Sequence, residues 1–209
     1  MQFLASKKKM SRFVSNPMYA VCTPEDTIRS LNRGNRKFRR RQSKGVLIPE
    51  CFVSGKKLSK GQAPWVAVLA CADSRVPPEW VFNCAPGEMF VVRTAGNVSF
   101  DDAVASMEFA VNVLKVDHIV VMGHSSCGAV NAALGSKKGL TPALKKLVIN
   151  IRKSVKGNPK LPKAIRQNTR GSARRLQSRS ELLDTAVKEG RLTIKSAVFN
   201  IKSGKIKWL

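Results

Sequence analysis

Two cysteines and a histidine stand where short apolar segments of the chain end, and their types suit the binding of a metal ion. Cys71 follows the apolar run 63–70, and His124 and Cys127 follow the run 118–122. Thiolates and imidazole are ligands that zinc prefers, and three protein ligands leave its fourth tetrahedral position open to water, as in catalytic sites. Either short motif alone says little. Because each motif follows a predicted buried strand, the two together predict a catalytic zinc site at Cys71, His124 and Cys127.

Asp73 and Arg75 lie two and four residues beyond the first of these ligands. A water molecule activated by zinc must lose a proton before it can attack a substrate. Asp73 could accept the remaining hydrogen of that water and orient it, and Arg75 could hold Asp73 in place and keep it ionised. We therefore expect Asp73 and Arg75 to form a catalytic pair. The alternatives are a structural ion pair, or an aspartate that itself binds zinc in a resting form.

The segments that carry these residues have the pattern of an α/β protein. Three short, almost wholly apolar runs are typical of parallel strands covered on both faces: 63–70, 89–93 and 118–122. Residues 192–201 predict a fourth strand, and Gly204 would turn the chain into an antiparallel edge strand at 205–209. Helical patterns lie between the later strands. The sequence thus predicts a mostly parallel four-stranded sheet plus an antiparallel edge strand, with helices on both faces.

The first part of the chain predicts a basic arm and then a helix. Thr23 is a suitable N-cap, Pro24 suits the first helical position, and the helix should run to about Arg41 as an N-terminal helical arm. We divide the chain into a basic arm, residues 1–22, and a single domain, residues 23–209.

The predicted sheet would bring the three metal ligands together. In a parallel α/β sheet, ligands bind beyond the carboxyl ends of the strands, so neighbouring strands would bring Cys71 to His124 and Cys127. Cys127 would then begin a helix, whose positive end lowers the pKa of a thiol.

Around these residues the sequence resembles a β-class carbonic anhydrase. The likeness extends from about residue 24 to residue 205 and is dense only in the middle. The segments that carry it are Cys71–Glu79, Pro86–Gly87, Phe90–Arg93, Ala95–Asn97 and Gly123–Gly128. The resemblance implies one zinc ion per subunit, held by Cys71, His124 and Cys127, with Asp73 and Arg75 as the catalytic pair. It also implies a lyase that reversibly hydrates carbon dioxide to bicarbonate and a proton.

The same resemblance implies a substrate pocket and a partner subunit. The matching pocket positions are Gln62, Phe90, Ala95, Phe109 and Gly128. In this family a glutamine amide binds a substrate oxygen and apolar side chains hold carbon dioxide. The glutamine and some aromatic residues come from the partner, which implies a homodimer or a higher even oligomer. The two phenylalanines could instead be ordinary core residues.

The charge of the chain is unusual, with 38 Lys and Arg against 13 Asp and Glu and a net charge of +25. The whole excess lies in residues 1–63 and 133–209, outside the segment that carries the predicted chemistry. Such a field attracts polyanions, so secondary binding of nucleic acid or another polyanion is possible. Aromatic residues make up only 6% of the chain and hardly interleave with the basic ones, which disfavours a stacking surface for bases.

Two other functions therefore remain open beside carbon dioxide hydration. One is the hydrolysis of carbonyl sulfide or carbon disulfide on the same scaffold. The other is a basic nucleic-acid-binding module that retains the fold.

Cysteine content and the absence of long apolar runs bear on the location of the protein. Five cysteines at irregular spacing favour ligands or core residues over disulfides, and no apolar run reaches membrane-spanning length. Met1–Ala5 is too short an apolar segment for a secretory signal. We expect an intracellular, cytoplasmic protein, with organelle targeting through the basic residues 1–24 as the weaker alternative.

Overall fold

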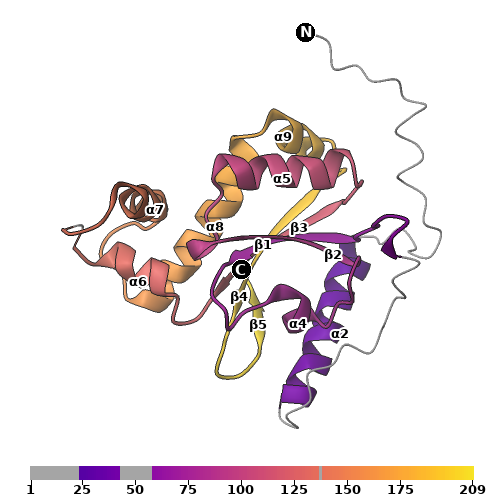
Figure 1. Ribbon diagram of the computed structural model, residues 1–209, viewed down its shortest axis with the longest axis horizontal. Coiled ribbons are helices and arrows are strands. Elements are labelled where there is room, and N and C mark those ends of the chain that lie inside the picture. The colour runs from indigo at the N-terminus through magenta and orange to yellow at the C-terminus, as the bar shows by residue number, and fades with distance from the viewer. Residues whose placement is uncertain (1–23, 43–57, 137) are drawn as a thin grey trace.

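The computed structural model describes residues 24–42, 58–136 and 138–209, which form a sheet covered by helices (Figure 1). The strands have the order β2-β1-β3-β4-β5; the first four are parallel, and β5 is antiparallel to β4. Their bounds are β1 Val66–Cys71, β2 Met89–Thr94, β3 His118–His124, β4 Thr193–Phe199 and β5 Ile206–Trp208. The predicted fold class is confirmed. The basic arm lies outside the described residues, and the division into an arm and one domain stays a prediction.

Both faces of the sheet are buried under helices, and each strand contributes to both because its side chains alternate. In β1, Val66, Val68 and Ala70 face one apolar cluster, while Ala67 and Leu69 face another. The helices α5 and α9 cover one face, and α2 and α4 cover the other (Figure 1). The helices of the described residues are α2 Pro24–Gln42, α4 Pro78–Phe82, α5 Asp101–Asn112, α6 Gly128–Leu134, α7 Pro142–Arg152, α8 Leu161–Ser178 and α9 Glu181–Lys188, with a 3₁₀ turn η2 at Ala95–Asn97.

The helix α2 buries Leu31 and Phe38 and approaches α4 very closely. A Cβ atom on Gly34 would lie 1.7 Å from the carbonyl oxygen of Phe82. Asn35 donates hydrogen bonds to the carbonyls of Val81, at 3.1 Å, and Gly204, at 2.9 Å. The helix is thereby fixed both to α4 and to the turn between the last two strands.

The starts of α7 and α8 follow from their first residues. Helix α8 begins at Leu161, with Pro162 in the first turn, where its missing N–H leaves no hydrogen bond unmade. In the Lys-rich segment, α7 begins after Thr141, whose hydroxyl accepts a hydrogen bond from the Leu144 N–H. Within the described ranges, none of the helices combines the length and apolarity that a membrane-spanning segment needs.

Candidate metal centre

The three predicted ligands meet at the carboxyl ends of two neighbouring strands. Strands β1 and β3 pair in parallel, so Cys71 at the end of β1 lies beside His124 at the end of β3, and Cys127 follows in the next turn. All three are buried, and their ligand atoms lie within 4.8 Å of one another. The two Sγ atoms are 3.9 Å apart. A tetrahedral zinc ion with bonds of about 2.3 Å to sulfur separates two thiolates by about 3.8 Å, so the spacing fits zinc.

His124 presents one ring nitrogen to this group. Its Nδ1 lies 2.9 Å from the Ser125 carbonyl oxygen and therefore carries the hydrogen that this acceptor requires. The lone pair is then on Nε2, which is buried and has no hydrogen-bond partner in the described part of the chain. An unpaired buried nitrogen is costly unless another group satisfies it. A metal ion between Nε2 and the two thiols would do so, and the residues thus fit a zinc ion.

The backbone of the η2 turn forms a hydrogen bond with the sulfur of Cys71. The Gly96 N–H donates to the Cys71 Sγ at 3.2 Å, and the Asn168 amide of α8 donates to the Gly96 carbonyl at 2.8 Å. Gly96 has a φ of 67°, which glycine adopts without strain. Hydrogen bonds from the Cys127 thiol and from the backbone outweigh the effect of burial and lower the pKa of Cys71 to about 4, which favours the thiolate that a metal binds.

Two opposing effects act on the pKa of Cys127. Cys127 does precede α6, and the N–H groups of Ala129 and Val130 act to lower its pKa. The hydrogen bond to Cys71, together with burial, is the larger effect and raises the pKa well above its ordinary value. The predicted effect of the helix start is therefore present, and the neighbouring Cys71 thiolate opposes it. Metal binding requires both thiols to lose their protons, and a divalent cation supplies the compensating charge.

Asp73 and Arg75 form a two-pronged ion pair beside the metal group. The Asp73 oxygens accept from Arg75 Nε at 2.8 Å and from Nη2 at 2.6 Å, and Oδ1 also accepts from the Arg75 backbone N–H at 3.0 Å. These bonds hold the pKa of Asp73 below its usual range, so the carboxylate stays ionised. Its Oδ2 lies 3.8 Å from His124 Nε2. Asp73 thus borders the metal group without belonging to it.

Arg93 is a further residue at this centre, beyond those predicted from the sequence. Its Nε donates to the Cys71 carbonyl at 3.1 Å, and its Nη2 donates to the Asp73 carbonyl. One side chain from β2 therefore holds the backbone on both sides of Ala72. Its contacts are to carbonyl groups, which every residue has, so no residue type in the partner segment could have indicated them.

The predicted pocket residues fall into two groups. Ala95 begins η2, next to the Gly96 that contacts Cys71, and Gly128 follows Cys127 at the start of α6. These two border the metal group of their own chain. The other three do not.

Gln62, Phe90 and Phe109 lie at the opposite end of the strands. Gln62 is exposed and precedes β1, nine residues before Cys71. Phe90 pairs with Ala67, whereas Cys71 pairs with Thr94, which puts roughly 13 Å of strand between Phe90 and the metal group. Phe109 packs on Phe90, with ring centroids 6.3 Å apart, and is 46% exposed. Within one chain, these three side chains do not meet the metal group.

Comparison with known proteins agrees with this geometry. The family model described as carbonic anhydrase matches residues 66–206. The chain belongs to the β-class carbonic anhydrase family. It is 36% identical to carbonic anhydrase 2 of Mycobacterium tuberculosis over 156 residues, which cover 71% of this chain and 75% of that protein. It is 34% identical to a carbonic anhydrase of Pseudomonas aeruginosa over 167 residues, 72% of this chain and 76% of that protein.

Solved structures show the same likeness. A β-carbonic anhydrase of Sordaria macrospora, one of two described as tetrameric, aligns with a TM-score of 0.67 at 25% identity, over 88% of this chain and 96% of that one. A Coccomyxa β-carbonic anhydrase in complex with acetazolamide aligns with a TM-score of 0.67 at 27% identity, over 85% and 83%. Members of this family are zinc enzymes, and the chain is a carbonic anhydrase, a lyase that hydrates carbon dioxide. The comparisons do not favour the sulfur-compound hydrolase or the nucleic-acid-binding module.

Proposed function

We propose that Cys71, His124 and Cys127 hold the zinc ion with which this enzyme hydrates carbon dioxide, and that Asp73 and Arg75 orient the reacting water. The observation that carries the proposal is the buried, unpaired Nε2 of His124, which lies within 4.8 Å of the two thiols and beside the carboxylate of Asp73. When bound, zinc supplies Lewis acidity, which lowers the pKa of a water molecule so that it can attack carbon.

Asp73 acts as a hydrogen-bond acceptor of fixed direction. Arg75 engages both carboxylate oxygens, so Asp73 cannot rotate freely, and its Oδ2 remains on the side of His124. An ionised carboxylate accepts hydrogen bonds and donates none. Asp73 therefore fixes the orientation of an attacking water, while its lowered pKa makes it a poor store for the proton, which passes to solvent or buffer.

A second copy of the chain completes the substrate pocket in this proposal. Gln62, Phe90 and Phe109 lie far from the metal group of their own chain, and Phe109 is 46% exposed on α5. A two-fold arrangement would bring these residues to the metal group of the partner. The tetrameric state described for the Sordaria enzymes is consistent with an even oligomer built from such pairs.

We also propose an intracellular location, where thiols are kept reduced. Cys71 and Cys127 must both be free thiolates to bind zinc, and their sulfur atoms are only 3.9 Å apart. An oxidising compartment would favour a disulfide between such neighbours.

The function is tested by stopped-flow measurement of carbon dioxide hydration on protein whose zinc content has been determined. The rate should rise with pH from neutral into the alkaline range, because the activated water must lose a proton. Asp73→Asn keeps the side-chain volume but removes the charge that Arg75 holds, and should lower kcat/KM by on the order of 100-fold at unchanged zinc content. Zinc-loaded protein without hydration activity, or a rate independent of pH over this range, would contradict the proposal.

A further inference from the structure

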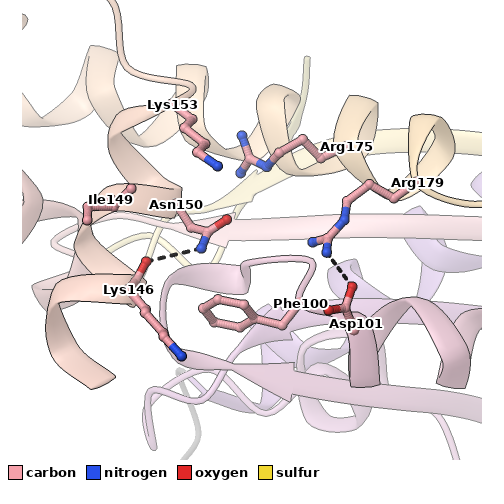
Figure 2. A pocket seen from close by; sticks show the side chains of 8 residues that line it. All are labelled: Phe100, Asp101, Lys146, Ile149, Asn150, Lys153, Arg175 and Arg179. Atoms are coloured by element: carbon pink, nitrogen blue, oxygen red, sulfur yellow. Dashed lines mark hydrogen bonds and ion pairs between the residues drawn. The ribbon is translucent and has the colours of Figure 1, made fainter. Parts of the chain in front are cut away.

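A basic pocket lies between α7, α8 and the start of α5, on elements outside the metal centre (Figure 2). Its volume is about 570 Å³. Lys153 and Arg175 point toward one another across the gap between the two helices, Phe100 faces them from the loop before α5, and Lys146 extends away from them at the other end. They are Phe100, Asp101, Lys146, Ile149, Asn150, Lys153, Arg175 and Arg179.

Positive charge is in excess among these side chains. The single carboxylate, Asp101, is bound by Arg179 (Figure 2). The charges of Lys146, Lys153 and Arg175 have no acidic partner among the described residues. Three like charges around one gap repel one another, and an anion placed among them would relieve that repulsion.

Arg175 is the best fixed of the three. Its guanidinium donates to the Ser154 hydroxyl and, at 3.3 Å, to the Ser172 hydroxyl, while its Nε is buried without a hydrogen-bond partner in the described part of the chain. Burial and the neighbouring Arg174 and Arg179 lower the pKa of Arg175. The Nη1 and Nη2 groups each use one N–H on a neutral hydroxyl and keep a second, so a guanidinium held in this way is suited to a multidentate anion such as phosphate.

The pocket also has an apolar wall. The Phe100 ring lies opposite Arg175 and Lys153 in the close-up view, and Ile149, which is 41% exposed, lines the same gap. Apolar surface beside fixed polar groups is the usual composition of a small-molecule site. A single ring between two helices offers no row of stacking surfaces for successive bases, so this arrangement favours a small ligand over nucleic acid.

We propose that this pocket binds a small organic phosphate, with the phosphate group on Lys153 and Arg175, Lys146 adding positive charge at the rim, and the carbon part on Phe100 and Ile149. The site is separate from the metal group and independent of the proposed hydration mechanism. Free phosphate and a phosphate monoester both carry the anionic group. Only the monoester has a carbon part that the apolar wall can contact, so the wall favours the monoester.

Binding is tested by isothermal titration calorimetry on the zinc-loaded protein at constant ionic strength, with phenyl phosphate, inorganic phosphate and phenol as probes. Phenyl phosphate should bind with the lowest Kd, inorganic phosphate more weakly, and phenol not measurably. Equal affinity for the two phosphates would overturn the role of the apolar wall. Absence of binding by either phosphate would overturn the site.

A matched pair of variants separates the pocket from the general positive field. Lys146→Gln with Lys153→Gln removes two exposed charges that line the pocket, and should raise the Kd for phenyl phosphate by about tenfold or more. Lys145→Gln with Lys156→Gln removes two exposed charges from the same region that do not line it, and should leave the Kd within about twofold.

An equal loss in both double variants would overturn the proposal, because long-range attraction would then explain the binding. Unchanged binding in both would also overturn it, since phosphate would then be bound elsewhere, for example at the metal. A short duplex DNA serves as competitor. If the duplex displaces phenyl phosphate from the wild-type protein and both double variants weaken this displacement equally, the region is a nucleic-acid surface and the proposal is overturned.

Discussion

At the scale of single residues, the metal group depends on bonds to the backbone around its ligands. The Gly96 N–H supports the Cys71 sulfur, the Ser125 carbonyl sets the tautomer of His124, and Arg93 binds the carbonyls of Cys71 and Asp73. Such supporting contacts orient the groups that bind the metal and tune their basicity. They also explain how two short motifs from different strands reach one geometry.

Arg93→Lys tests this support. Lysine keeps the positive charge but is a compact donor that cannot reproduce the two directed bonds of the guanidinium. We expect kcat/KM for hydration to fall roughly 10- to 100-fold, with the protein still folded and the change larger in kcat than in KM. Steady-state hydration kinetics with zinc analysis measure this. Full activity in Arg93→Lys would show that the two carbonyl contacts do not position the site.

The sequence predicted the ligands at this scale because their chemistry depends on side-chain type. A cysteine and a histidine–cysteine pair, each at the end of an apolar run, are enough to predict zinc ligands. Arg93 could not be found in this way, because its partners are carbonyl oxygens. The effect of Cys71 on the pKa of Cys127 could not be predicted either, because only the fold brings the two sulfur atoms to 3.9 Å from each other.

At the scale of elements, the centre requires β1 and β3 to be neighbours and the covering helices to lie close to the sheet. The apolar runs predicted the strands to within a few residues, because strands buried on both faces leave a continuous apolar segment. The short helix α4, five residues long and preceded by proline, has no such signal. Its contact with α2 depends on the absence of a side chain at Gly34.

Gly34→Ala should therefore destabilise the protein, although alanine favours helices. Its Cβ would lie 1.7 Å from a backbone oxygen of α4, which cannot move away by rotation of a side chain. We expect the free energy of unfolding to fall by roughly 2 kcal/mol or more in urea denaturation. Arg36→Ala, at an exposed position of the same helix, is the control and should change it by less than about 0.5 kcal/mol. Equal effects of the two changes would refute close packing at Gly34.

At the scale of the whole molecule, the separation of Gln62, Phe90 and Phe109 from the metal group predicts shared active sites. The family likeness identified these residues by sequence position, but their distance from Cys71 follows only from the strand register. The basic pocket, too, could not be predicted from the sequence. Its charges come from two helices and look in the sequence like ordinary exposed lysines and arginines.

Subunit complementation tests the shared site. Asp73→Asn and Gln62→Ala should each lower hydration strongly when made in every subunit. Co-expressed with different tags, they form mixed pairs in which one site has both native residues. About a quarter of the wild-type activity should then return, because half of the pairs are mixed and each has one intact site of two. If Gln62 served its own chain, the mixture would show only the average of the two variants.

The hydration mechanism as a whole requires that two cysteines and one histidine bind zinc and leave one position for water. X-ray absorption at the zinc edge of the wild-type protein measures this most directly. We predict two sulfur neighbours at about 2.3 Å and two nitrogen or oxygen neighbours at about 2.0–2.1 Å. A spectrum with no sulfur neighbours, or with three or more, would contradict this coordination.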